Sequence, residues 1–403
     1  MSASATPPVP FLDPTRPDFS MRSDAVRAAR EQSWYATTPY GLAVLQYDAV
    51  KELVRHPALR QGSGQWPDHN QAEGDWARWW KRSMLNKEGE DHARLRRLAQ
   101  PAFAPRQVTA LRPRFERLAT TLIDDIVDRG RCEFMADFAE PYASQIVCEL
   151  IGIDTAQWRD VADHAIDMGY ALSVNYKHDE ARSDAALNAL MAIAGELVAE
   201  RRRVPADDFV GSLITAHDAH GSLSEQEVLD LIVISIFGGI DTTRGQIGLA
   251  LACFLEHPDQ WALLGSRPEL ARAAVDEVMR VRPTTTWVSR EATVDFRYRD
   301  LAIAAGTTVH LFAAASGTDP AYFEAGFDIT ATRKPHFAFG GGKHHCIGSP
   351  VARSDMMVAL TCLSQRLHAP RLAGPARWLP DSGNTGPLSL PIAFDRACFH
   401  NPQ

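Results

Sequence analysis

The chain has 403 residues, carries a formal net charge of −8 and is 45% hydrophobic by composition. This length and apolar fraction suffice for a large buried core. The acidic balance, without a block of consecutive basic residues, argues against nucleic acid as a partner. The six cysteines are scattered and form no Cys-x-x-Cys pair, so we expect a reducing, cytoplasmic environment and no disulfide framework.

Residues 1–20 are rich in Pro and Ser and contain no long apolar run. This composition predicts an irregular arm and is unlike a signal peptide or a membrane anchor. The most apolar stretch, residues 231–240, is flanked by Asp230 and Asp241. A membrane-spanning helix needs roughly 20 apolar residues, so we expect no membrane association.

Residues 21–403 are interpreted as one domain, mainly α with a small β portion, because apolar residues recur mostly at helical spacing. Strands are expected at residues 41–47, 296–303 and 307–313. A turn at residues 304–306 would join the last two strands into a hairpin.

Residues 61–83 contain three glycines, a proline and four tryptophans: Trp66, Trp76, Trp79 and Trp80. The composition predicts a long loop. Such a loop could close over a ligand, or it could be a surface loop held by the tryptophan rings. The sequence alone does not distinguish these two roles.

The clearest helix spans residues 225–256. Ser224 and Glu227 fit a capping box at its start, and Pro258 follows its end. The middle of the segment is apolar on all sides, so the helix should cross the core.

The centre of this helix contains two adjacent glycines and two polar residues: Gly238, Gly239, Asp241 and Thr242. Each glycine in a helix interior costs roughly 1 kcal/mol relative to alanine. Close approach of a flat ligand to the backbone would offset this cost. Tight helix packing beside a hydrogen-bonded polar pair would also offset it, and the pattern leaves both explanations open.

The strongest local signal is the segment FGGGKHHCIG, which runs from Phe339 to Gly348. Three glycines precede Cys346, and Ser349 and Pro350 then begin a helical segment. The free amides and the dipole at a helix N-terminus favour a thiolate. The glycines permit unusual backbone angles and let a planar group approach the cysteine.

Two other chemistries are compatible with parts of this loop. A zinc site would use His344, His345 and Cys346, but three adjacent residues cannot readily face one tetrahedral ion, and no partner cluster lies at the usual spacing. A cysteine nucleophile with a histidine base is possible locally. It leaves the composition of the 225–256 helix unexplained.

The loop resembles the haem signature of the cytochrome P450 family, Phe-x-x-Gly-x-x-x-Cys-x-Gly, at Phe339, Gly342, Cys346 and Gly348. The resemblance extends from about residue 20 to the end of the chain. Each short motif is weak alone, whereas the ordered set is specific. The resemblance implies that Cys346 is the axial ligand of the haem iron.

Further motifs resemble the family in the expected order. Gly238, Gly239, Asp241 and Thr242 resemble its oxygen-activating helix motif, Glu277 and Arg280 its structural Glu-x-x-Arg motif, and His92, Arg96, Arg290 and His344 its propionate-binding residues. The family often adds an arginine just before a Phe ahead of the cysteine loop. Residues 323–327 contain no arginine there, which leaves the third member of the Glu-x-x-Arg network unassigned.

The resemblance implies the cytochrome P450 fold around a buried haem b. It also implies a monooxygenase that inserts one atom of O₂ into a small, largely apolar organic substrate. Asp241 and Thr242 would deliver protons, and Gly238 and Gly239 would make room for dioxygen. The expected substrate walls are the 61–90 segment, the helix around Ile234 to Thr242, and the four residues Thr285, Thr286, Trp287 and Val288. The segment around residues 384–390 would close the far side.

About 57 residues follow Cys346, too few for a flavin domain. We therefore expect electrons to come from a ferredoxin and its NAD(P)H-dependent reductase. We also expect a monomer. Arg94, Arg97, Lys343 and Arg353 could form a basic patch for an acidic ferredoxin, or they could be ordinary solvated charges.

Two other functions are possible on the same fold. One is a peroxygenase driven by hydrogen peroxide, and the other is a haem-binding sensor or carrier without turnover. The presence of Asp241 and Thr242 argues against both, because neither function needs a proton relay for O₂.

Overall fold

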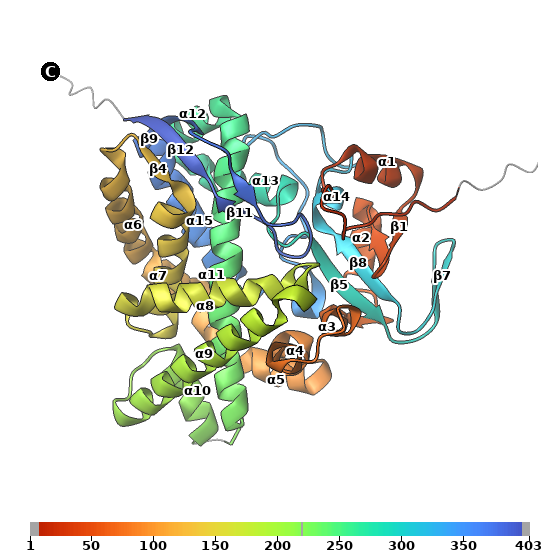
Figure 1. Cartoon of the computed structure of the whole chain (residues 1–403), viewed down its shortest axis with the longest axis horizontal. Coiled ribbons are helices and arrows are strands. Elements are labelled where there is room, and N and C mark those ends of the chain that lie inside the picture. The colour runs from red at the N-terminus through yellow and green to blue at the C-terminus, as the bar shows by residue number, and fades with distance from the viewer. Residues whose placement is uncertain (1–7, 219–220, 397–403) are drawn as a thin grey trace, which may run out of the picture.

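Helix α11 (Glu225–Glu256) crosses the centre of the molecule, and most of the other helices surround it (Figure 1). The computed structural model describes residues 8–218 and 221–396. The predicted bounds of this helix are confirmed, and so is its capping box. The Ser224 hydroxyl accepts the Glu227 N–H at 3.2 Å, and the Glu227 carboxylate accepts the Ser224 N–H at 2.8 Å, so two otherwise unpaired donors are satisfied.

The other helices are α1 (Asp24–Gln32), α2 (Tyr47–Leu53), α3 (Trp66–His69), α4 (Asp75–Arg82), α5 (Gly89–Ala99), α6 (Pro105–Val127), α7 (Glu140–Ile151), α8 (Trp158–Gly169), α9 (Tyr176–Arg203), α10 (Phe209–Asp218), α12 (Pro258–Ser266), α13 (Ala271–Val281), α14 (Ala313–Gly317) and α15 (Ser349–Arg366). The strands are β1 (Tyr35–Thr38), β2 (Gly41–Val44), β3 (Leu59–Gln61), β4 (Arg131–Glu133), β5 (Trp287–Ala292), β6 (Phe296–Tyr298), β7 (Leu301–Ile303), β8 (Thr308–Phe312), β9 (Leu367–Leu372), β10 (Arg377–Trp378), β11 (Pro387–Ser389) and β12 (Pro391–Arg396).

The predicted fold class, mainly α with a small β portion, is confirmed. The largest sheet has five strands in the order β1-β2-β8-β5-β3 and lies to one side of α11 with α1 and α2 (Figure 1). Residues 8–20 contain no helix or named strand and join the sheet edge through a single bridge between Phe11 and Thr37. Residues 8–20 are thus irregular in the structure, and residues 1–7 of the predicted arm lie outside the described chain.

Two strand predictions need correction. Strand β2 ends at Val44 and not at residue 47, because Tyr47 begins α2. Residues 296–303 form two paired strands, β6 and β7, so the predicted hairpin through residues 304–306 is wrong. Strand β8 pairs with β5 and β2 instead. The turn inside 296–303 has no glycine. Arg299 adopts a φ of 51° there, and its guanidinium lies over the Trp34 ring.

The prediction of a loop over residues 61–83 is also wrong, because most of this segment is helical. Pro67 lies in the first turn of α3 and Gly74 caps the start of α4, so these residues mark helix boundaries. Trp76 and Trp79 are fully buried. Their burial supplies the packing that holds two short helices in place.

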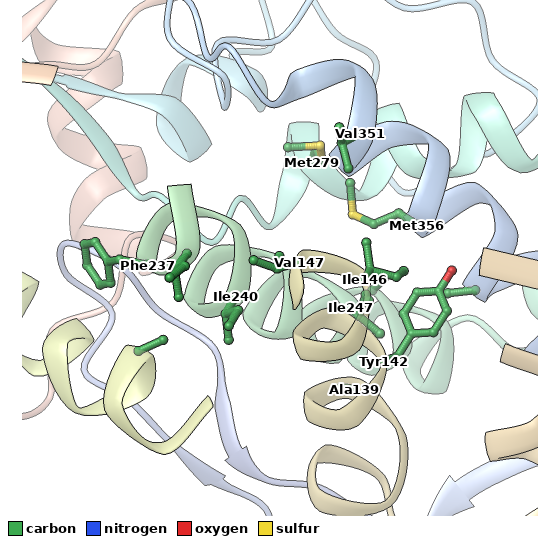
Figure 2. Packing of buried hydrophobic residues seen from close by; sticks show 14 of the residues in the cluster. Ala139, Tyr142, Ile146, Val147, Phe237, Ile240, Ile247, Met279, Val351 and Met356 are labelled. Atoms are coloured by element: carbon green, nitrogen blue, oxygen red, sulfur yellow. The ribbon is translucent and has the colours of Figure 1, made fainter. Parts of the chain in front are cut away.

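Helices α7, α11 and α15 pack together around the two central glycines of α11 (Figure 2). Their contacts distinguish the two explanations, approach of a flat ligand and tight helix packing. A Cβ atom on Gly239 would lie 2.8 Å from Val147 of α7, whereas a Cβ atom on Gly238 would meet nothing within 4 Å. Tight helix packing therefore explains Gly239. Gly238 borders open space.

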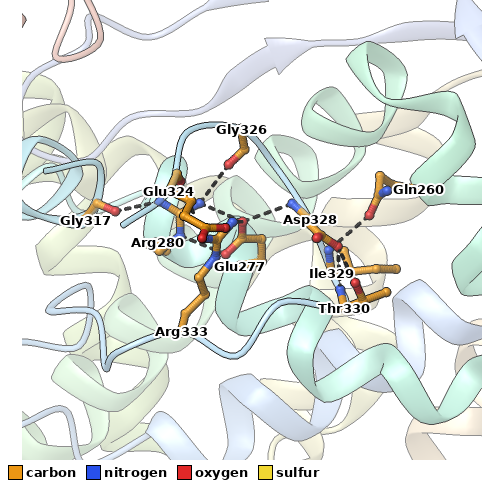
Figure 3. A network of polar contacts seen from close by, with 10 residues as sticks. All are labelled: Gln260, Glu277, Arg280, Gly317, Glu324, Gly326, Asp328, Ile329, Thr330 and Arg333. Atoms are coloured by element: carbon orange, nitrogen blue, oxygen red, sulfur yellow. Dashed lines mark hydrogen bonds and ion pairs between the residues drawn. The ribbon is translucent and has the colours of Figure 1, made fainter. Parts of the chain in front are cut away.

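A buried ion-pair network lies beside α13 (Figure 3). Arg280 and Glu277 form two hydrogen bonds, of 2.7 and 2.6 Å, and each side chain is 2% exposed. Arg280 also donates to the carbonyls of Gly317 and Gly326, at 2.7 and 2.9 Å. The missing arginine is Arg333, whose Nη2 atom lies 3.4 Å from Oε1 of Glu277. The third position of the network is thus filled from a point later in the chain than residues 323–327.

Among the described residues, no helix has both the length and the apolar run that crossing a membrane would require.

The network predicts unequal effects of two substitutions. Glu277→Ala should lower the free energy of unfolding by about 3–5 kcal/mol, because it leaves the buried Arg280 charge without its acidic partner. Arg333→Ala should cost about 1 kcal/mol, since it leaves the Glu277–Arg280 pair intact. Urea unfolding followed by circular dichroism measures both. Arg112→Ala, which breaks a pair whose side chains are 53% and 50% exposed, should have no measurable effect. Equal losses in the two network variants would contradict this prediction.

Candidate functional site

A cavity of about 380 Å³ lies between α11, β5 and the cysteine loop. This volume is within the range of small-molecule sites, roughly 300–1,000 Å³. The predicted site residues that line it are His92, Arg96, Ile234, Gly238, Gly239, Thr242, Thr285, Trp287, Val288, Arg290, Phe339, His344, Cys346 and Gly348. Residues predicted at widely separated positions of the chain therefore meet around one space.

The cysteine loop is a tight turn in which glycine occupies two left-handed positions. Gly340 and Gly342 have φ angles of 67° and 70°, in the left-handed region that other residues rarely adopt. The Cys346 N–H donates to the Phe339 carbonyl at 2.9 Å and closes the turn. Gly342 does not line the cavity, so its role in the structure is to shape the loop.

Cys346 is the one cysteine of the described chain that lines the cavity. Burial raises the pKa of its thiol, and backbone hydrogen bonds at Gly348 and Ser349, together with the Arg96 charge, act in the opposite direction. Such donors favour a thiolate. At three other cysteines burial outweighs the groups that favour a thiolate and raises the pKa to about 12: Cys132, Cys148 and Cys253.

Arg290 is a buried cation at the cavity wall. It is 3% exposed, and its guanidinium donates to Gln61 at 2.9 Å and to the Gly341 carbonyl at 3.1 Å. No carboxylate of the described residues lies within ion-pair distance of it. Burial lowers the pKa of Arg290 to about 10. A buried charge without a counter-ion is costly, so this site would be stabilised by an anionic group in the cavity.

Two histidines adjoin this cation. The rings of His92 and His344 lie 4.1 Å apart, and His344 Nε2 lies 3.0 Å from Glu88. Burial and the neighbouring His92 lower the pKa of His344 to about 4. Burial and Arg96 lower the pKa of His92. Glu88 was not predicted, although its spacing of four residues from His92 was a usable signal.

Arg96 connects α5 to the cysteine loop. Its Nη2 atom donates to the His345 carbonyl at 2.7 Å. Burial lowers the pKa of Arg96, while Cys346 raises it. The cation and the cysteine are therefore close enough to stabilise each other as an ion pair.

Asp241 and Thr242 are adjacent in α11 but face different surroundings. The Thr242 hydroxyl donates to the Gly238 carbonyl at 2.6 Å, and its side chain lines the cavity. Asp241 is 5% exposed and does not line the cavity. Its carboxylate pairs with Arg244 at 3.2 Å and accepts the Asn384 amide at 3.0 Å.

The predicted substrate walls need one correction, at Thr286. Its hydroxyl donates to the Gly383 carbonyl at 2.9 Å, and it lines a separate second cavity of about 510 Å³. The first cavity is lined by the neighbours Thr285 and Trp287 but not by Thr286. From the 61–90 segment the cavity receives Gln61, Ser63, Trp66, Trp80, Met84 and Leu85, and of residues 384–390 it receives Asn384.

The wall expected around residues 234–242 includes Phe237, and Asp355 is among the lining residues that sequence reasoning missed. Phe237 adds an aromatic ring beside Trp80. Asp355 of α15 is buried, and burial raises the pKa of its carboxyl well above the usual value. Its Oδ1 atom has no hydrogen-bond partner among the described residues. An acidic residue on the apolar face of the helix predicted after Ser349 was the signal that could have identified it.

Within residues 8–218 and 221–396, no group of three or more His, Cys, Asp and Glu side chains forms a metal cluster.

Comparisons with known proteins agree with this geometry. Residues 266–370 match the sequence model of the Cytochrome P450 family. The chain is 34% identical to luteothin monooxygenase of Streptomyces thioluteus over 396 residues, covering 96% of this chain and 97% of that protein. It is 33% identical to mycinamicin IV hydroxylase/epoxidase of Micromonospora griseorubida, covering 88% and 91%.

Solved structures show the same fold. The crystal structure of CalO2 is similar with a TM-score of 0.88 at 28% identity, covering 96% of this chain and 100% of that one. P450BioI, solved with a fatty acid ligated to an acyl carrier protein, is similar with a TM-score of 0.84 at 26% identity, covering 92% and 97%. Relatives with nearly full coverage are named as monooxygenases, which supports an enzyme over a carrier without turnover. This chain belongs to the cytochrome P450 family and is a haem-dependent monooxygenase.

Proposed function

We propose that the cavity holds haem b with the Cys346 thiolate as the axial ligand of the iron. The observation that carries this proposal is that a thiol from a glycine turn lines the same cavity as Gly238, which borders open space. When bound, the haem supplies the activation of O₂, and its thiolate ligand favours O–O cleavage. The remaining steps depend on the residues of this chain.

Four basic side chains would bind the two propionates. Arg290 is the best placed, because it is buried without an acidic partner in the described chain. Its partners at the cavity wall would be His92, Arg96 and His344. A propionate beside the two histidines would favour their charged forms and raise their pKa values.

The substrate would be a small, largely apolar organic molecule. Aromatic and aliphatic side chains dominate the wall opposite the cysteine loop, among them Trp66, Trp80, Phe237, Ile234 and Met84. Trp66 and Trp80 have their ring N–H groups bound to the Ala171 and Ser63 carbonyls, each at 2.8 Å, so their apolar surfaces remain available for contact.

Asp241 and Thr242 would hold and move the protons that the O₂ chemistry supplied by the haem consumes. The Thr242 hydroxyl uses its hydrogen in the bond to Gly238. Its oxygen lone pairs can therefore accept a hydrogen bond from a water in the cavity. Asp241 lies one residue earlier in the helix and would be the acidic source that resupplies this water.

Electrons would come from a ferredoxin that binds near the cysteine loop. Arg94 and Arg353 are paired with Glu227 and Asp276, at 2.6 and 3.0 Å. Arg97 and Lys343 are exposed and have no ion pair within the described chain. The basic patch for an acidic partner would thus consist of Arg97, Lys343 and the exposed Arg55, which packs beside Gly342.

The ligation proposal predicts the spectrum of one variant. Cys346→Ser should abolish the red-shifted Soret band of the ferrous–CO complex, because the thiolate ligand is lost. Cys362→Ser makes the same change in α15 at a cysteine that does not line the cavity, and it should keep the band. An unchanged CO spectrum in the Cys346 variant would exclude this cysteine as the ligand.

The proton pathway predicts different defects at two adjacent residues. Thr242→Ala should keep haem and substrate binding but divert most NAD(P)H-derived electrons into hydrogen peroxide. Asp241→Asn should slow turnover overall, by about 10² or more, because it removes an acid–base group. Product formed per NAD(P)H consumed, measured with the peroxide released, separates the two. Unchanged coupling in a folded Thr242→Ala protein would remove Thr242 from the pathway.

The electron-donor proposal predicts a salt-dependent effect. Charge reversal at Arg97 and Lys343 should slow reduction by a ferredoxin roughly tenfold at low ionic strength and weaken its salt dependence. Stopped-flow reduction under CO measures the rate. Arg297→Glu on the β6–β7 hairpin, outside the patch, is the matched control and should not change it. The patch would be refuted by equal rates in the double variant and the wild type.

A further inference from the structure

Asn384 stands between the two cavities and contacts Asp241. Two short segments, 284–286 and 383–385, form a divider: Thr285 and Asn384 line the 380 Å³ cavity, and Thr286 and Thr385 line the 510 Å³ cavity. Backbone hydrogen bonds of 2.9 and 2.8 Å join the two segments. The divider is therefore fixed in its backbone, and only its side chains can rearrange at low cost.

The Asn384 side chain makes one bond on each side. Its amide nitrogen donates to Oδ2 of Asp241 at 3.0 Å, and its carbonyl oxygen accepts the Thr285 hydroxyl at 3.1 Å. This orientation follows from chemistry, because a carboxylate can only accept a hydrogen bond. Thr285 and Asp241 are thus joined through one amide, and the Thr285 end lies on the cavity surface.

This amide also restrains Asp241. Nη2 of Arg244 binds Oδ1 of Asp241, and Asn384 binds Oδ2. A Cβ atom on Gly169 would lie 2.9 Å from Oδ1, so α8 closes the side of the carboxylate that faces it. The carboxylate has no contact with Thr242 or with the cavity in this arrangement. Of its two partners, Asn384 is the one that lines the cavity.

We infer that Asn384 is a positioning residue that couples occupancy of the substrate cavity to the position of the Asp241 carboxylate. The inference rests on the proposed proton pathway and goes beyond it. A substrate seated against Thr285 and Asn384 competes for their mutual hydrogen bond. The amide then turns and releases Oδ2 of Asp241, which becomes free to exchange a proton with water near Thr242. Without substrate, the amide holds the carboxylate away from the cavity.

The test uses the haem-loaded enzyme, NADPH, and spinach ferredoxin with its reductase. The probe is the 7-alkoxycoumarin that the wild type dealkylates fastest, and its dealkylation is driven either by NADPH or by added hydrogen peroxide. Hydrogen peroxide supplies oxygen that already carries two protons. Peroxide-driven dealkylation therefore does not depend on proton delivery by Asp241. NADPH oxidation and peroxide release are recorded with and without the probe, in H₂O and in D₂O.

Asn384→Ala should slow NADPH-driven dealkylation about tenfold or more, within the range expected for an acid–base pathway. It should also change the solvent isotope effect and make NADPH oxidation less dependent on the probe. Peroxide-driven dealkylation should fall clearly less than NADPH-driven dealkylation, because only the NADPH-driven reaction depends on Asp241, and the CO spectrum should keep its red-shifted band. Thr285→Val, which removes the donor to Asn384 but keeps the bond to Asp241, should weaken the dependence on the probe in the same direction.

Thr284→Val is the matched control. It removes a hydroxyl bond of 2.7 Å across the same divider, to the Thr385 carbonyl, without touching Asn384 or Asp241. If it reproduces the Asn384→Ala defect, the role of Asn384 is structural and the inference fails. The inference also fails if Asn384→Ala slows NADPH-driven and peroxide-driven dealkylation equally, since that result indicates a loss of substrate binding.

Asp241→Asn in the same assay separates the two proposals. If NADPH-driven turnover of this variant equals that of the wild type, the proton pathway itself is wrong. If Asp241→Asn is impaired and Asn384→Ala behaves as wild type, the pathway stands and the coupling through Asn384 is refuted.

Discussion

The buried pair between Glu277 and Arg280 is the interaction on which the position of the cysteine loop depends. Arg280 binds the carbonyls of Gly317 and Gly326, and Glu277 receives the N–H of Asp328 at 3.1 Å. One ion pair on α13 therefore fixes the irregular chain that leads to Cys346. Removing either charge would leave the other buried without its partner. The contacts that Glu277 and Arg280 make with residues 317–328 are therefore expected to be lost together.

The second constraint is the centre of α11, where two adjacent glycines have different roles. Gly239 lets α7 approach through Val147, and Gly238 leaves open space in the cavity. Close packing of Gly239 against α7 stabilises α11, and this stabilisation offsets the missing side-chain contacts at Gly238. The same helix carries Asp241 and Thr242, whose side chains reach different surroundings. One element thus combines structural support, space for a ligand and polar groups.

The sequence was most informative where the signal is local. The capping box at Ser224 determines where α11 begins. The glycines before Cys346 allow the backbone angles that the turn requires. Prediction failed where distant contacts decide the outcome. Helices α3 and α4 depend on the burial of Trp76 and Trp79, and the β6–β7 turn depends on Arg299 contacting Trp34. Arg333 and Asn384 reach their partners only through tertiary structure, so no spacing rule could have assigned them.

The solitary charge of Arg290 has a consequence for the stability of the protein. Folding buries the Arg290 guanidinium beside carbonyl groups, with no carboxylate of the described residues at ion-pair distance, and this burial lowers the stability of the protein without a ligand. An anionic ligand that enters the cavity removes the cost, and a ligand that binds only the folded state adds stability by mass action. Binding of such a ligand and the packing of strand β5, which carries Arg290, would therefore be thermodynamically linked, so each would stabilise the other.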